Sequence, residues 1–156
     1  MSDYRKKYNK GLERSVVHIF NNFLSDTSIR EVTDSQAGSK HHNVWLEMNG
    51  TFEGEMQITL TDNLITELIH FFHKDRNIRK TRHVIHDVIG EIANLISGTF
   101  VNQLQYIGHD IKLSPPEFEE DPISMKALYN NISLSFESAL GGFDIDIYYK
   151  DILYGK

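Results

Sequence analysis

The spacing of apolar residues changes between two periods along the chain, and this change restricts the fold more than any other feature. Apolar residues recur at helical spacing over residues 8–24, over 64–72, and over a longer segment that ends near Ile107, just before Gly108. They alternate with polar residues over 44–48, 55–60, 132–136 and 143–147. This order of helix, strands, two helices and strands predicts an α+β domain, in which long helices pack on a largely antiparallel sheet.

The segments between these elements carry turn and loop residues. Residues 26–43 are polar and are predicted to form a loop with a short strand around 29–33. Residues 49–54 contain an Asn-Gly pair and a second Gly, which predicts a hairpin with a rather long loop. A further short strand is expected over 110–113, because the Pro-Pro pair that follows must end it.

Length and composition exclude several classes of protein. A chain of 156 residues suits one domain, predicted to span 1–156, and the lack of Cys excludes disulfides, thiolate zinc sites and a catalytic cysteine. The formal charge of −6 argues against a nucleic-acid partner or an anionic membrane surface. No apolar segment approaches the roughly 20 residues of a membrane span, and none of signal-peptide type follows the basic start. A soluble, cytoplasmic protein is therefore expected.

The third helical segment separates into two faces when its residues are placed about 100° apart. One face carries the apolar residues that should contact the core, and it includes Ala93. The opposite face, within roughly 60° of Glu91, carries a set of small or polar residues: Asp87, Glu91, Asn94, Gly98, Asn102 and Gln105. The simplest interpretation is that this is the solvated side of an amphipathic helix.

Two residues on this polar face favour a more specific interpretation. Asn94 is a mediocre helix former, and Gly98 costs about 1 kcal/mol relative to Ala inside a helix. A glycine at an outward position lets another surface approach closely. Glu91 and Asn94 are three residues apart, so their side chains project side by side from one helical turn. The face is therefore predicted to reach into a partner's cleft.

A metal site is a weaker interpretation of the same helix. His83, Asp87 and Glu91 follow one another at intervals of four residues. A surface His–Asp pair at this spacing is ordinarily a weak solvated contact, and the His spacing of catalytic zinc sites is missing. No metal site is predicted here. His41 and His42 are expected in a loop, where they would bind only adventitious metal.

Other catalytic motifs are missing from the sequence. Neither a Gly-x-Ser-x-Gly nucleophile elbow nor a phosphate-binding Gly-x-x-x-x-Gly-Lys loop occurs. The paired carboxylates Asp144 and Asp146 alternate along a predicted strand, and we expect them to point outward and keep that sheet face soluble.

The motif GEIANLISG at 90–98 resembles the active-site helix of the CheC/CheX/FliY family of bacterial chemotaxis phosphatases. The signature of that family is Glu-x-x-Asn, followed four residues later by Gly. The surrounding order is similar to the CheX members in particular: a strand after Gly54, a helix, the motif helix, and then GHDIKLSPP at 108–116. The likeness covers about residues 44–150, and the first helix also has a counterpart.

This resemblance implies hydrolysis of the aspartyl-phosphate on a CheY-type response regulator. Glu91 would pair with a regulator lysine and fix docking, and Asn94 would place its amide beside the phosphoryl group and orient the attacking water. Asp87, Gly98 and Asn102 on the same face are expected to contact the regulator. The chain would need no cofactor of its own, because the Mg²⁺ in such a complex belongs to the regulator.

Two positions bear on how far the resemblance extends. CheC and FliY members carry two such sites, but here Glu13 is followed three residues later by Val16, so a second site is not expected. The residue between Glu91 and Asn94 that is often Gly in relatives is Ala93. Because Ala93 falls on the packed side of the helix, it should adjust packing and leave the chemistry in place.

Three further interpretations accompany the phosphatase prediction. The same helix could bind a response regulator and sequester it without hydrolysis, or the chain could chiefly assemble with another protein. A pure docking surface would tolerate loss of Asn94, whereas a phosphatase would not. Edge strands of a short sheet invite strand pairing, and CheX relatives dimerise, so a homodimer is also expected.

Overall fold

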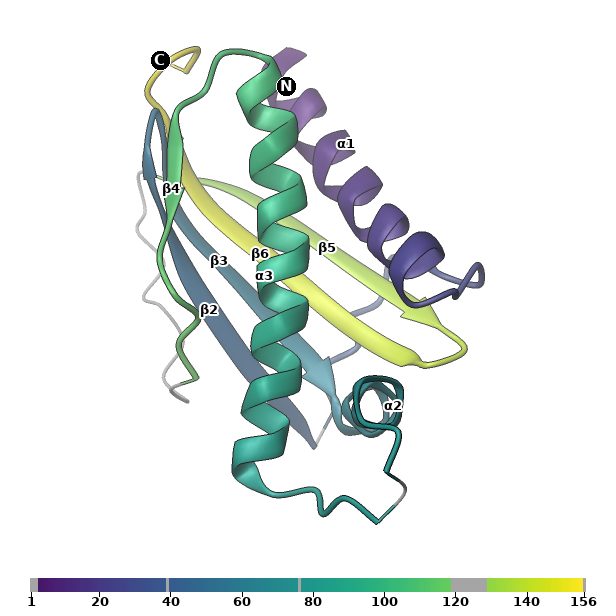
Figure 1. The fold of residues 1–156 in the computed structure, drawn as a ribbon. Coiled ribbons are helices and arrows are strands. Elements are labelled where there is room, and N and C mark those ends of the chain that lie inside the picture. The colour runs from purple at the N-terminus through teal and green to yellow at the C-terminus, as the bar shows by residue number, and fades with distance from the viewer. Residues whose placement is uncertain (1–2, 39, 76, 119–128, 156) are drawn as a thin grey trace.

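The computed structural model describes residues 3–38, 40–75, 77–118 and 129–155. Within them a six-stranded antiparallel sheet has the order β1-β5-β6-β3-β2-β4. The helices lie on one side of this sheet, and α3 packs over β2, β3 and β4 (Figure 1). The α+β prediction is confirmed. The strands are β1 (Arg30–Val32), β2 (His41–Gly50), β3 (Phe52–Thr61), β4 (Ile111–Leu113), β5 (Asn130–Ser138) and β6 (Gly141–Asp151).

The helices follow the predicted segments with one extension. The first helix, α1 (Asp3–His18), begins earlier than predicted because its polar first turns give no apolar period, and it continues as a π-helical turn, η1 (Ile19–Phe23). The second, α2 (Asp62–Phe72), is capped by the Thr61 hydroxyl, which accepts the Leu64 N–H at 3.3 Å. The third, α3 (Arg82–Tyr106), ends before Gly108, whose φ of +101° suits glycine.

The strand predictions need two corrections. The segment predicted as a long hairpin loop, 49–54, mostly belongs to strands: Asn49 and Gly50 pair with β4, and Phe52 and Glu53 pair with β6. The predicted 26–43 loop is also too long, since β2 begins at His41, which pairs with Thr61 of β3. Neighbouring strands supply these pairings, so the local sequence does not reveal them.

Asp144 does not face solvent as predicted. It is 9% exposed, and its carboxylate accepts hydrogen bonds from the Ser35 hydroxyl at 2.6 Å and from the Gln36 N–H at 2.9 Å. The polar segment before β2 folds over this strand and satisfies the carboxylate, as a buried charge requires. Asp146 remains at the sheet surface, where the Ser133 hydroxyl donates to it at 2.5 Å.

The apolar side of α3 forms the centre of the core. Ile89, Ile92, Ile96 and Phe100 are 0–2% exposed and belong to one cluster with the inward residues of β2, β3 and β6. By length and composition α3 could cross a membrane, but half of its most apolar stretch is buried inside the protein. Packing on the sheet accounts for those apolar residues.

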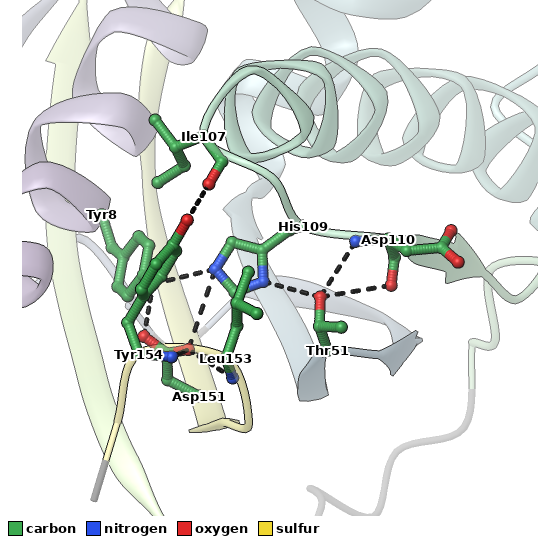
Figure 2. Close-up of polar contacts among 8 residues, drawn as sticks. All are labelled: Tyr8, Thr51, Ile107, His109, Asp110, Asp151, Leu153 and Tyr154. Atoms are coloured by element: carbon green, nitrogen blue, oxygen red, sulfur yellow. Dashed lines mark hydrogen bonds and ion pairs between the residues drawn. The ribbon is translucent and has the colours of Figure 1, made fainter.

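A buried hydrogen-bond network fixes the C-terminal end of α3 (Figure 2). The Thr51 hydroxyl donates to His109 Nδ1 at 2.8 Å, and His109 Nε2 donates to the Tyr8 hydroxyl at 2.9 Å. Tyr8 in turn donates to Asp151, and burial raises its pKa, so the hydroxyl keeps its proton. The Tyr154 hydroxyl donates to the Ile107 carbonyl at the helix end. Residues from α1, the β2–β3 turn and the end of β6 therefore hold one end of α3.

We expect the stability of the protein to fall as the pH drops below about 6.5. Burial lowers the pKa of His109 against the opposing effect of the Asp151 carboxylate, so the folded chain favours the neutral ring. Between the two pKa values the unfolded chain therefore binds more protons than the folded chain. The contribution of the neutral His109 ring to stability is complete above the pKa of the unfolded state, and it is lost as the pH falls through the pKa of the folded state. Urea midpoints at pH about 7.5 and about 5.5 should differ less in His109→Gln than in the wild type.

The half-buried His86 has a lowered pKa too, so the variant should reduce the pH dependence and not abolish it. The exposed His83 provides the control, and His83→Gln should keep the wild-type difference. An unchanged difference in His109→Gln would contradict the assignment of a neutral buried ring.

Candidate functional site

Glu91 and Asn94 lie on the side of α3 that faces away from the sheet, and both side chains are exposed. Within the described residues, neither side chain makes a hydrogen bond or an ion pair with the rest of the chain. Side chains three apart on a helix are neighbours, with Cβ atoms about 5–6 Å apart. The carboxylate and the amide are thus adjacent, hydrated and available to a partner.

The other predicted docking residues extend this surface along the helix. Asp87 lies one turn before Glu91, and Asn102 lies two turns after Asn94; both are exposed. Asp87 forms an exposed ion pair with His83, with 3.4 Å between Oδ2 and Nε2. Such a pair contributes little to stability because water screens it. The structure therefore brings all the predicted site residues onto one face, here called the polar face of α3: Asp87, Glu91, Asn94, Gly98 and Asn102.

Gly98 is not required by the fold. A Cβ built on Gly98 would meet no atom within 4 Å, whereas a Cβ on Gly90 would lie 3.1 Å from Phe118 Cζ. Gly90 thus makes room for a packed aromatic ring, and Gly98 opens onto free space. The bare backbone at Gly98 lets another molecule approach the helix closely.

The residues that were predicted to pack inside the protein on α1 and α3 are buried. Ala93 is 1% exposed, so it lies in the core as predicted. Val16 of α1 is fully buried. The position on α1 that would correspond to Asn94 therefore cannot present a side chain to solvent.

The histidines require one correction. His41 and His42 are not in a loop but begin β2, and both line a cavity beside the start of α3. Within the described ranges, no three His, Asp or Glu side chains are grouped so that they could hold a metal ion. The His109 network and the contact of Phe118 with Gly90 were not predicted, because the residues involved are far apart in the sequence.

The arrangement of α3 allows a particular kind of chemistry. An amide can accept from a water through its carbonyl and donate through its NH₂ at the same time. A carboxylate beside it adds a negative charge that can pair with a cation of another molecule. The polar face of α3 is therefore a candidate surface for contact with a partner.

Comparison with known proteins identifies the family. The family model described as chemotaxis phosphatase CheX matches residues 43–145, more than half of the chain. The chain therefore belongs to the CheX family of chemotaxis phosphatases, as the sequence motif predicted. No curated protein sequence gives a significant match.

Solved structures with the same fold include several chemotaxis proteins. The CheX protein of Vibrio vulnificus is 20% identical, with a TM-score of 0.77 over 96% of this chain and 100% of that chain. A CheX–CheY–BeF₃–Mg²⁺ complex from Borrelia burgdorferi gives 19% identity and a TM-score of 0.73 over 92% of this chain and 97% of the other. The FliM middle domain of Vibrio alginolyticus is more distant, with 15% identity and a TM-score of 0.57 over 90% and 89%.

The open space at Gly98 leads to a test of its role in the isolated chain. Gly98→Ala should raise the free energy of unfolding by about 0.5–1 kcal/mol, because alanine is the better helix former and its Cβ meets nothing. Gly90→Ala is the matched control on the same helix. Gly90→Ala should raise the free energy of unfolding less than Gly98→Ala, because its Cβ would crowd Phe118. Urea denaturation measures both, and a larger gain at position 90 would contradict the account.

Proposed function

We propose that the chain hydrolyses the aspartyl-phosphate of a CheY-type response regulator, with the polar face of α3 as the active surface. The observation that carries this proposal is the exposure of Asn94 and Glu91 on one turn of a rigidly packed helix, with no partner within the described residues. Membership of the CheX family supports it. The complex from Borrelia burgdorferi, in which a CheX protein is bound to CheY with BeF₃ and Mg²⁺, supports the choice of partner.

Asn94 is proposed to orient the attacking water. The water oxygen attacks phosphorus in line, the bond from phosphorus to the aspartyl oxygen breaks, and inorganic phosphate and a free carboxylate result. In such a transfer the protein mainly positions the reacting groups and stabilises the charge that is distributed over the phosphoryl oxygens. A neutral amide can do both beside an anionic phosphoryl group, whereas an aspartate there would repel it.

Glu91 is proposed to fix docking by pairing with a lysine of the regulator. A charge-assisted contact of this kind is stronger than a neutral hydrogen bond. Asp87, Gly98 and Asn102 would contribute to the same interface, with Gly98 allowing close approach. The Mg²⁺ that the reaction uses would be the regulator's own, so this chain would supply no metal ligand.

Binding without hydrolysis is the rival function. A sequestering module would use the same face and would slow the loss of phosphate from the regulator. The presence of Asn94 beside Glu91 favours catalysis, because docking alone does not require an amide at that position. The two functions predict opposite effects on phosphate release.

Phosphate release from a phosphorylated CheY-type regulator tests the proposal. The wild-type chain should accelerate release, and Asn94→Ala should lose roughly 10²-fold or more in rate while its affinity for the regulator stays nearly unchanged. Glu91→Ala should mainly weaken binding. Gln105→Ala, at an exposed position further along α3 and outside the proposed interface, is the control for general surface changes and should have a much smaller effect on rate than Asn94→Ala.

Equal release by the wild type and Asn94→Ala would exclude this mechanism. Release slowed by the wild type would favour sequestration instead.

The proposal includes a cytoplasmic site of action, where response regulators are found, and a homodimer. Among the described residues, β1 pairs only with Ser135–Glu137 of β5, and no described strand pairs with the same edge of β5 over Asn130–Leu134. This open edge supports a homodimer. Unpaired strand edges can template pairing with a second chain.

A further inference from the structure

A cavity of about 580 Å³ lies between the first turns of α3 and the start of β2. This volume is in the range of roughly 300–1,000 Å³ that is usual for small-molecule sites. Its α3 lining includes Arg82, Ile85 and Ile89. These positions lie on the opposite side of the helix from Glu91 and Asn94, so an occupant would not compete with a protein docked on the polar face.

Two stacked aromatic rings form one part of the lining. The rings of His86 and Phe118 are stacked, with 4.3 Å between their centroids and 8° between their planes. Gly90 permits this arrangement, since a Cβ there would crowd the Phe118 ring. The stacked pair offers a flat aromatic surface beside the buried Ile85 and Ile89, and a planar ring can pack on it.

The remaining lining is polar and includes one cation, Arg82, beside His41, His42 and Asn43. Arg82 makes no hydrogen bond or ion pair with the described residues, so its guanidinium is available to a ligand. His42 lies 3.8 Å from Asp62, but that carboxylate is already paired with Lys80 at 2.7 Å. His41 adds a second imidazole to the lining.

The electrostatic environment of His86 is mainly positive. Burial lowers the pKa of His86 most, and the positive charges of Arg82, His42 and His83 lower it further. Asp87 acts in the opposite direction. An anion bound in the cavity would offset these positive charges.

We propose that this cavity binds a planar aromatic phosphate of mononucleotide size, with the ring packed against His86 and Phe118 and the phosphate held by Arg82 and His42. A guanidinium fork matches phosphate geometry, and an imidazole N–H can donate a further hydrogen bond to the phosphate. The proposal concerns binding alone, since the chain carries no phosphate-binding Gly-x-x-x-x-Gly-Lys loop that would suggest nucleotide hydrolysis.

Titration of the full chain with adenosine 5′-monophosphate tests the proposal, with calorimetry for affinity and NMR for the site. Binding should shift the resonances of Arg82, His86 and Phe118 and should move the His86 titration to higher pH, because the anion stabilises the imidazolium. Adenosine and inorganic phosphate, tested separately, should each bind more weakly than the nucleotide.

Two variants and a matched control assign the contacts. Arg82→Gln should weaken binding of the nucleotide about tenfold, whereas Arg79→Gln, an exposed arginine outside the lining, should not. Phe118→Leu should reduce the preference for the nucleotide over inorganic phosphate.

Absence of shifts at millimolar nucleotide would overturn the proposal. Equal binding of nucleotide and adenosine would overturn the role of charge, and equal binding of nucleotide and inorganic phosphate would overturn the role of the ring. None of these readouts depends on the regulator, so failure here would leave the proposed phosphatase function standing.

Discussion

The burial of one side of α3 against the sheet is the interaction on which the rest of the structure depends. The helix crosses the sheet (Figure 1), and its apolar residues Ile92, Ile96 and Phe100 are almost completely removed from water. Each such side chain contributes roughly 1.5–3 kcal/mol when it is buried. A helix held in this way has a fixed rotation about its axis. The direction in which Glu91 and Asn94 point is therefore set by the core.

Both ends of α3 are fixed as well. The His109 network ties the C-terminal end to α1, to Thr51 and to the end of β6, and at the other end the Thr81 hydroxyl caps the helix by accepting the Val84 N–H at 3.2 Å. Chemistry that depends on positioning benefits from a rigid support, because a misplacement of about 1 Å can cost two orders of magnitude in rate. Side chains on an exposed surface can thus be positioned precisely when the helix that carries them is held rigidly.

The two faces of α3 could be predicted from the sequence because helical period alone decides which residues meet the core. Ala93 and Asn94 are adjacent in the chain, and periodicity places one inside and the other outside, as found. The motif at 90–98 then indicated the family. The roles of Glu91 and Asn94 stay predictions, since exposure shows availability and not chemistry.

Features that depend on long-range partners could not be predicted. Asp144 alternates as an outward residue should, yet residues 35–37 fold over it and supply its hydrogen bonds. The sequence around His41 and His42 is typical of a loop, and only their pairing with β3 makes them part of a strand. Tyr8 and His109 are 101 residues apart, and nothing local in either segment indicates that they meet. In each case the deciding partner comes from another part of the chain.

Mapping the contact surface in solution tests the central claim most directly. The isotope-labelled chain would be mixed with a CheY-type regulator held in its active form by beryllofluoride, and amide chemical shifts would be followed along α3. We expect the largest changes along the polar face between Asp87 and Asn102. Changes confined to the outer face of the sheet, with that helix surface unaffected, would contradict it.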